Sequence, residues 1–293
     1  IDCRTDERRA FDLVMLVTFL GVRGSTPAPG AEFVQFGGHT SCVTVSTGIG
    51  RAPSLVLDAG TGLRTLSAKL DGQPFQGSIL LSHLHWDHMQ GIPFFTAGDR
   101  DDAVVEVLIP AQNGRTGEEL LGQAMGPPAF PISPSGLKGS WQFTAVEPGV
   151  RSVEGFQVRI EEVNHKGGRT FGFRVSDGTV DIAYIPDHVA RAVEGPELDK
   201  LVSGVDLLIH DAQFVDDERA LADAYGHSTV NDCVDIATRY SARSLVWFHH
   251  GPQRTDTQLL EMERGWRVEW PVRMAREGES LDVAAFAAGE VPV

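Results

Sequence analysis

The segment that decides the fold runs from His83 to His88 and is His-Leu-His-Trp-Asp-His. It directly follows the run Ser78–Ser82 (Ser-Ile-Leu-Leu-Ser), whose apolar centre predicts a buried strand. If the backbone leaves that strand in extended form, the side chains of His83 and His85 fall on one side, whereas in a helix they would point roughly 200° apart. Four metal-capable side chains in six positions are more than chance gives a chain with 10 histidines among 293 residues.

The same segment can serve two adjacent metal ions. Asp87 and His88 lie just beyond the first two histidines and can face a second point close by. One short loop can then give two imidazoles to one ion, and a carboxylate with an imidazole to the other. The alternatives are a surface histidine tract or an expression tag, but a tag is normally terminal and unmixed, while this segment is internal and includes Asp and Trp.

The bulk composition is that of an ordinary globular enzyme, with 42% hydrophobic and 22% charged residues. A chain of this length and composition can bury a sizeable core. The formal net charge of -15 argues against a broad nucleic-acid-binding face, which would be basic. The net charge does not exclude a small phosphate-bearing substrate, because two divalent cations would make a pocket locally positive.

The cysteines and the N-terminal segment indicate the cellular compartment in which we expect the protein. Cys3, Cys42 and Cys233 are widely spaced and form no CxxC pair, so we expect neither a disulfide framework nor a thiolate zinc site. No apolar run is long enough to span a bilayer, and the charged residues 1–12 do not resemble a signal peptide. We expect a cytoplasmic protein with a flexible extension at residues 1–12 and a single domain at 13–293.

Apolar strands and helical segments alternate along the chain. Strands are predicted at 13–21, 42–46, 54–58, 78–82, 104–109, 141–146, 156–163, 170–176, 180–185, 205–209 and 244–248, and helices near 63–70, 116–125, 196–203, 228–240 and 255–265. The segments 272–276 and 280–283 are predicted to form a closing hairpin, and the proline-rich stretch 126–134 to form a loop at the surface or pocket edge. This order predicts an α/β (α+β) fold in which two mixed sheets face each other with helices outside.

Further histidines and aspartates stand where predicted strands end. They are His165, Asp187, the pair His210 and Asp211, and the pair His249 and His250. Because the ends of several strands can converge on one cleft, we expect these side chains to join the His83–His88 segment.

The sequence resembles the metallo-β-lactamase superfamily, and within it the ribonuclease Z-like and cyclic-nucleotide phosphodiesterase branch. The His-X-His-X-Asp-His motif carries the first resemblance, and a set of shorter motifs carries the second. These are Asn164-His165 before Phe171-Gly-Phe173, Asp187 after a tyrosine-bearing strand, Gly226-His-Ser-Thr229, His249-His-Gly-Pro252, Gly21-Val-Arg-Gly-Ser-Thr-Pro27 and Gly37-Gly-His-Thr-Ser-Cys42. The resemblance covers roughly residues 14–290 and implies a four-layer αββα sandwich of two mixed β-sheets with helices on both outer faces.

The resemblance also implies a dinuclear metal centre with seven ligands. One ion would be bound by His83, His85 and His165, the second by Asp87, His88 and His249, and Asp187 would bridge both. Imidazole and carboxylate ligands without thiolate suit Zn²⁺, our first choice, and also Mn²⁺ or Fe²⁺. Two such ions about 3.5–4 Å apart can bind a shared water, lower its pKa and stabilise both oxygens of a phosphoryl displacement.

Alternatives remain open for the outer ligands. His165 could be a solvated loop residue, and Asp187 could be a turn or cap residue. His250 competes with His249 for the last position; the motif favours His249, which would leave His250 facing solvent or substrate. His188 is expected to be a neighbour of the ligands.

Three further residues are given supporting or catalytic roles. By the resemblance, His227 is the candidate proton donor to the leaving oxygen, although alone it could simply flank the following helix. Asp87 could also orient or accept a proton from the attacking water. Asp211 is expected to hydrogen-bond a ligand imidazole, with a buried capping role as the alternative, and Asp58 to support the histidine loop. No catalytic role is expected for His39.

These features predict a dinuclear metal-dependent phosphodiesterase for a small diester, and a cyclic nucleotide is the leading substrate. Transfer-RNA-processing members of the branch usually carry a long arm, and only 21 residues separate His165 from Asp187. Phe130 could stack on a base. The alternatives are a ribonuclease Z-like RNA-processing nuclease and a non-hydrolysing nucleotide-binding protein. We expect no membrane partner, no extended nucleic acid and, as is common among similar proteins, a homodimer.

Overall fold

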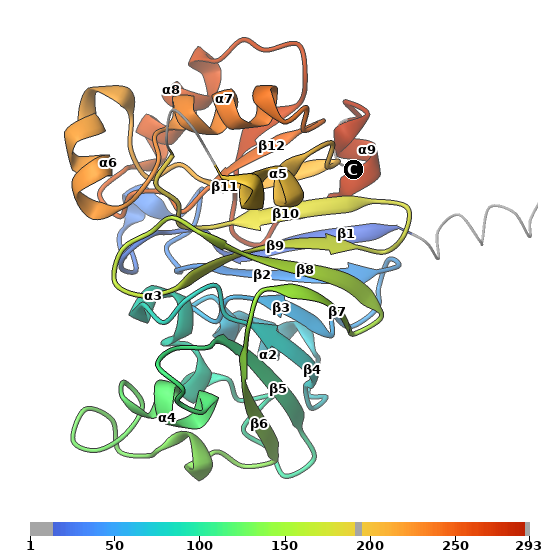
Figure 1. Ribbon diagram of the computed structural model, residues 1–293, viewed down its shortest axis with the longest axis vertical. Helices are drawn as coiled ribbons and strands as arrows, with labels where there is room; N and C mark the ends of the chain where they lie inside the picture. Colours follow the sequence, from blue (N-terminus) through green and yellow to red (C-terminus); the bar gives the residue numbers. More distant parts are fainter. Residues whose placement is uncertain (1–13, 191–194, 291–293) are drawn as a thin grey trace, which may run out of the picture.

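Two seven-stranded β-sheets pack face to face in the computed structural model, with helices on the outer faces (Figure 1). The structure describes residues 14–190 and 195–290. This arrangement is the four-layer sandwich that the sequence predicts. The extension predicted at residues 1–12 lies outside the described residues.

The first sheet has the strand order β14-β1-β2-β3-β4-β5-β6. Its strands are β1 (Met15–Gly21), β2 (Cys42–Thr47), β3 (Leu55–Leu57), β4 (Gln76–Leu80), β5 (Val104–Pro110), β6 (Ser140–Val146) and β14 (Ser280–Asp282). Strands β3 to β6 run parallel, while β14, β1, β2 and β3 pair antiparallel. The sheet is therefore mixed, as expected for this class of sandwich.

The second sheet has the order β13-β12-β11-β10-β9-β8-β7. Its strands are β7 (Gly149–Val153), β8 (Phe156–Val163), β9 (Thr170–Ser176), β10 (Asp181–Ile185), β11 (Leu207–Asp211), β12 (Leu245–Phe248) and β13 (Val272–Met274). Strands β10 to β13 run parallel. Because parallel strands end at the same edge of a sheet, the residues after β10, β11 and β12 are brought together there.

The helices of the described residues are short and cover the outer faces of the two sheets (Figure 1). They are α2 (Leu63–Lys69), α3 (Trp86–Met89), α4 (Gly117–Gly122), α5 (Pro196–Val202), α6 (Arg219–Tyr225), α7 (Val230–Arg239), α8 (Asp256–Gly265) and α9 (Val283–Ala287). Capping boxes at Thr116, Thr229 and Thr255 start α4, α7 and α8. None of these helices has the length and apolarity that crossing a membrane requires.

Three apolar clusters hold the layers together. The central cluster lies between the sheets and joins side chains of both, such as Phe19 of β1 with Phe248 of β12, whose ring centroids are 6.1 Å apart. The second packs α2 and α4 on the first sheet, and the third packs α5, α7 and α8 on the second sheet. Burial of these apolar side chains is the main favourable term in folding.

The closing hairpin predicted for 272–276 and 280–283 is wrong. Strand β13 pairs with β12 in the second sheet, whereas β14 pairs with β1 in the first sheet. The segment between them therefore passes from one sheet to the other. Each strand has only three residues, so the local pattern shows that they are strands but cannot show which partner each one pairs with.

Strand β7 and the α-helices α3, α6 and α9 were missed, and β7 had a visible signal. Strand β7 forms an antiparallel hairpin with β8 through Glu154 and Gly155, which both have positive φ (51° and 84°). Two central residues with positive φ are typical of the tight turns that join paired strands, and a glycine at the second position favours them. Of the missed helices, α6 ends at Gly226 with φ of 90°.

Candidate metal centre

The His83–His88 segment leaves β4 in extended form and then turns into α3. His85 is the residue before the helix and has φ of -68° and ψ of 150°. The rings of His83 and His85 consequently lie on one side, with centroids 4.3 Å apart. Asp87 and His88, inside the helix, are both buried and face a neighbouring point. The local geometry is the one that the spacing predicted.

Four residues from three separate parts of the chain form the first cluster: His83, His85, His165 and Asp187. The Nε2 atom of His83 lies 3.0 Å from Asp187 Oδ2. The Nε2 atom of His165 lies 3.3 Å from His85 Nδ1 and 3.9 Å from Asp187 Oδ2. One nitrogen of each imidazole is therefore directed to a common point beside the carboxylate.

Asp87, His88 and His249 form the second cluster. The Nε2 atoms of His88 and His249 are 3.2 Å apart, and His249 Nε2 lies 3.1 Å from Asp87 Oδ2. Asp187 reaches this cluster as well, because its Oδ2 is 3.0 Å from His88 Nε2 and its Oδ1 is 3.0 Å from His249 Nε2. Asp187 thus lies between the two clusters, as a bridging carboxylate would.

The buried polar atoms of these clusters fit metal ions. The Nε2 atom of His83 and the Oδ1 atom of Asp187 are buried and have no hydrogen-bond partner, despite the short distances around them. Buried polar groups are normally paired, so such atoms call for a missing partner. Nitrogen and carboxylate donors without thiolate match Zn²⁺, Mn²⁺ or Fe²⁺.

The electrostatics favour neutral imidazoles at His85 and His165 beside the ionised carboxylate of Asp187. Burial, together with the neighbouring imidazoles of His83 and His165, lowers the pKa of His85 to about 3. Burial also lowers the pKa of His165 to about 4. For Asp187, burial opposes ionisation, but the surrounding histidines hold the pKa of the carboxyl well below its usual range. His85, His165 and Asp187 therefore have the protonation states that metal ligands need. Burial opposes the charged form of His88, but the charges of Asp87, Asp187 and Asp58 outweigh it and raise the pKa of His88 well above its usual value.

Asp58 holds one imidazole of the second cluster in position. Its Oδ2 accepts hydrogen bonds from His88 Nδ1 (2.8 Å), from the Tyr184 hydroxyl (2.9 Å) and from the Ser82 hydroxyl (2.9 Å). With Nδ1 of His88 held by Asp58, Nε2 is the ring atom that is directed to the cluster. Asp58 therefore supports the histidine loop in the way the sequence analysis expected.

Asp211 hydrogen-bonds the imidazole of His227, whereas the sequence analysis expected it to hydrogen-bond the imidazole of a metal ligand. Its Oδ2 accepts a hydrogen bond from His227 Nδ1 (2.9 Å), and His227 is not one of the seven expected ligands. The backbone N–H groups of His188 and Ser228 donate to the same oxygen, at 3.1 and 3.2 Å. Asp211 is the last residue of β11, so its side chain meets the loop before α7 rather than the metal clusters.

Asp211 also determines the protonation of His227. Burial alone lowers the pKa of His227, but the charge and hydrogen bond of Asp211, with Asp187 and Asp87, outweigh it and raise the pKa to about 9. A protonated imidazole with Nδ1 held by a carboxylate presents its Nε2–H to the pocket. This is the arrangement that a proton donor needs.

A pocket of about 410 Å³ opens onto both clusters. Its lining residues are Ser25, Leu84, His85, Trp86, Asp87, Asp187 and His227. Ser25 is a site residue that the sequence analysis did not single out, and its backbone N–H donates to Asp87 Oδ2 (2.7 Å). The sequence signal for Ser25 was its position in the Gly21–Pro27 motif. The structure explains the glycine before it, because a Cβ atom on Gly24 would lie 2.4 Å from the His249 ring.

Several histidines and one aromatic residue lie outside the pocket. His250 is 1% exposed, and its Nε2 donates to the carbonyl of Ala275 (2.9 Å), so the expectation that it faces solvent or substrate is wrong. His188 contacts His210 at 3.2 Å and belongs to none of the clusters found among residues 14–190 and 195–290. His39 contacts Thr61 (3.1 Å). Phe130 lines a separate groove beside the pocket.

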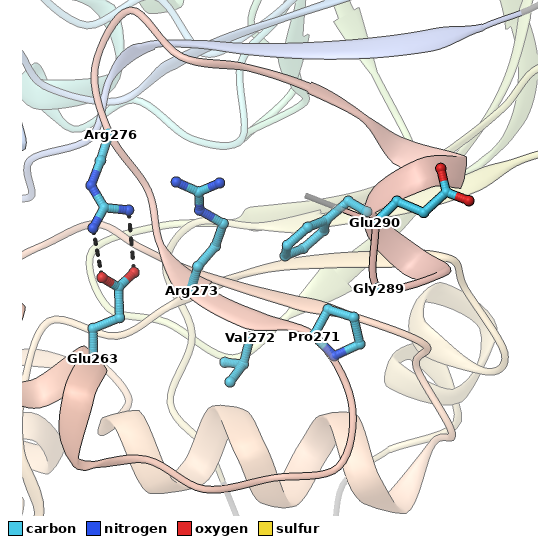
Figure 2. A pocket seen from close by; sticks show the side chains of 8 residues that line it. Glu263, Pro271, Val272, Arg273, Arg276, Gly289 and Glu290 are labelled. Carbon is cyan, nitrogen blue, oxygen red and sulfur yellow. Dashed lines mark hydrogen bonds and ion pairs between the residues drawn. The ribbon is translucent and has the colours of Figure 1, made fainter. Parts of the chain in front are cut away.

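A second cavity of about 410 Å³ lies between β13, the end of α8 and α9 (Figure 2). Three of its four charged lining residues form ion pairs, and Glu290 is the fourth. Arg276 and Glu263 face one another at 2.6 Å, and Arg273 is 2.6 Å from Glu279. This cavity therefore offers no set of free ligands to a metal ion.

Comparisons with known proteins agree with this geometry. The family model of the β-lactamase superfamily domain matches residues 54–250. Curated relatives include the ribonuclease Z of Natronomonas pharaonis, 25% identical over 310 residues with 91% of this chain and 97% of the relative covered. Another is the ribonuclease Z of Bradyrhizobium diazoefficiens, 28% identical over 293 residues with 93% and 85% covered.

Solved structures share the fold. The metallo-β-lactamase fold protein YhfI of Bacillus subtilis superposes with a TM-score of 0.69 at 19% identity, covering 92% of this chain and 99% of that one. The short form of human tRNase Z gives 0.65 at 21% identity, with 92% and 99% covered. A diphosphatase of the PhnP family gives 0.66 at 18% identity, with 91% and 97% covered. The chain therefore belongs to the metallo-β-lactamase superfamily of metal-dependent hydrolases.

Proposed function

We propose that this protein is a dinuclear metal-dependent phosphodiesterase that hydrolyses a small phosphodiester, with a cyclic nucleotide as the leading substrate. The observation that carries the proposal is the position of His227 in the wall of the pocket that both ligand clusters line. The metal ligands by themselves are compatible with hydrolysis of a β-lactam, lactone, thioester or phosphodiester, and a proton donor beside them favours a substrate with a poor alkoxide leaving group, such as an alkyl phosphodiester.

Each residue has a defined task in this proposal. Two divalent ions held by the seven ligands would supply an activated water and stabilise the charge that develops on the phosphoryl oxygens. Asp87 accepts a hydrogen bond from the backbone of Ser25 and lies 3.1 Å from His249, so its carboxylate is fixed beside the pocket. His227 holds a proton at Nε2 and delivers it to the leaving oxygen, while Asp211 keeps the ring in the required orientation.

The preference for a small substrate is supported by the surroundings of the pocket. Only residues 164–169 connect β8 to β9, so no long arm projects from this part of the described chain. Neither lysine nor arginine is among the residues that line the pocket in the described structure. With a formal net charge of -15, the chain has little to attract an extended polyanion.

An RNA-processing nuclease is the second candidate, because curated relatives that cover nearly the whole chain are named ribonuclease Z. A basic surface elsewhere on the molecule, or on a second copy, would favour it. Light scattering, which measures the mass in solution, tests whether the chain forms the homodimer that the sequence analysis expects.

One assay separates these candidates. The purified chain, loaded with Zn²⁺ or Mn²⁺, is incubated with cyclic mononucleotides, bis-p-nitrophenyl phosphate, a precursor transfer RNA with a 3′ extension and a thioester. We expect hydrolysis of the small diesters and none of the RNA. Cleavage of the RNA alone would establish the nuclease, and tight binding of a nucleotide without product would indicate a binding protein. The Asp187→Asn variant shows which products depend on the metal clusters.

A further inference from the structure

An apolar groove adjoins the metal pocket and shares a wall with it. The groove has a volume of about 320 Å³. Its lining residues are Trp86, Met89, Gln90, Pro93, Phe94, Leu121, Ala124, Met125, Ala129 and Phe130. Trp86 lines both the groove and the metal pocket, so a molecule that occupies one can extend into the other across a single side chain.

The short helix α3 explains why the two cavities adjoin. Trp86, Met89 and Gln90 are spaced three and four residues apart, so they share one face of the helical turn. Asp87 and His88 lie on the other face and enter the second ligand cluster. Trp86 directly precedes Asp87 in α3. A group that stacks on the Trp86 ring therefore lies close to the metal clusters.

The aromatic rings of the groove are left accessible. Trp86 is 73% exposed and Phe94 is 60% exposed. Phe94 meets Phe130 edge to face with ring centroids 5.8 Å apart, and this contact joins the α3 side of the groove to the segment after α4. In Figure 1, α3 and α4 lie on the same side of the molecule. Exposed aromatic side chains grouped in this way mark a binding surface.

We propose that this groove binds the planar aromatic group, a nucleobase, of a phosphodiester whose phosphate lies at the metal clusters; this inference rests on the proposed function. None of the groove's lining residues in the described structure is charged, which suits an uncharged base and not a second phosphate. Aromatic side chains stack on any base. The amide of Gln90, with Nε2 3.4 Å from the Thr40 hydroxyl, adds one polar contact.

Two substrates with the same leaving group test the groove. They are the p-nitrophenyl ester of thymidine monophosphate and methyl p-nitrophenyl phosphate, which share the leaving group and differ in that the first carries a nucleoside where the second carries a methyl group. The quantity compared is the ratio of their kcat/KM values. We expect Trp86→Ala and Phe130→Ala each to lower this ratio by about five- to tenfold. Trp86→Phe, which keeps a ring, should restore part of it.

The matched control is Val104→Ala, because Val104 is 54% exposed on β5 and lines neither cavity. It should leave both kcat/KM values unchanged. Ratios within twofold of the parent in both alanine variants would overturn the groove assignment. The same result together with a loss of dimer mass would show that the groove is an interface between copies.

A binding measurement keeps the groove testable if hydrolysis itself fails. If the parent chain hydrolyses neither ester, the proposed function is wrong. Equilibrium dialysis of thymidine monophosphate then tests the groove assignment independently of hydrolysis. Binding that weakens at least fivefold in Phe130→Ala supports the groove, and binding that is absent or unchanged contradicts it.

Discussion

The metal pocket and the cavity beside β13 have the same volume, about 410 Å³, but they are lined by different polar groups. In the cavity beside β13 each arginine has a glutamate partner, as Arg276 has Glu263 (Figure 2). In the metal pocket, buried nitrogen and oxygen atoms converge without satisfying one another. Size does not distinguish a functional site in this fold. The kind of polar group does, because imidazole nitrogens and carboxylate oxygens converge in the metal pocket, whereas arginine–glutamate ion pairs lie beside β13.

The largest effect is expected from Asp187→Asn in the metal pocket. The change removes the carboxylate that lies within 3.0 Å of His83, His88 and His249. We expect metal content to fall and kcat/KM to drop on the order of 10³-fold. Metal analysis and steady-state kinetics measure the two effects. Retention of both ions with near-normal turnover would remove the bridging role.

His227→Asn is expected to have the next largest effect, about 10²–10³-fold on kcat. Because a proton donor matters most for a poor leaving group, the loss should be larger for a cyclic nucleotide than for bis-p-nitrophenyl phosphate. The metal content should remain at the parental level. His227 also lies near Asp187 and His249, so a loss of metal would identify it as a ligand and not as the acid.

Two buried carboxylates form a matched pair with effects of about 10–100-fold. Asp58 holds His88 at 2.8 Å and Asp211 holds His227 at 2.9 Å. Asp58→Asn should therefore weaken metal affinity, measured by competition with a chelator. Asp211→Asn should lower turnover at full metal occupancy. The same phenotype in both variants would contradict this division between ligand support and acid support.

The smallest effect is expected in the cavity beside β13. Glu263→Gln weakens a partly exposed ion pair, so the free energy of unfolding should fall by less than about 1 kcal/mol. Hydrolysis and metal content should not change. Urea unfolding and the phosphodiesterase assay provide the measurements. A loss of activity comparable to that of Asp211→Asn would mean that the two cavities are coupled.

Much of this organisation was predictable because it depends on short-range spacing. The prediction for this segment required only that the backbone leave a strand in extended form and then turn. The structure has this backbone conformation at His83, His85, Asp87 and His88. Most strands were also predicted, because buried strands are continuous apolar runs. The pairing of β13 and β14 with different sheets was not predictable, since strands of three residues carry no information about their partners.

The sequence by itself determined which side chains could bind metal ions and which short segments would present them, because residue type and backbone periodicity are local properties. Only the tertiary structure decided that Asp211 supports His227 and that Trp86 separates the pocket from the groove. It also places His249, the member of the pair that the motif favours, at the clusters and turns His250 away from them. His249 has φ of 58°, which ends the alternation of β12 and redirects the two side chains. Such choices depend on contacts between distant parts of the chain, and these contacts form only when the two sheets pack.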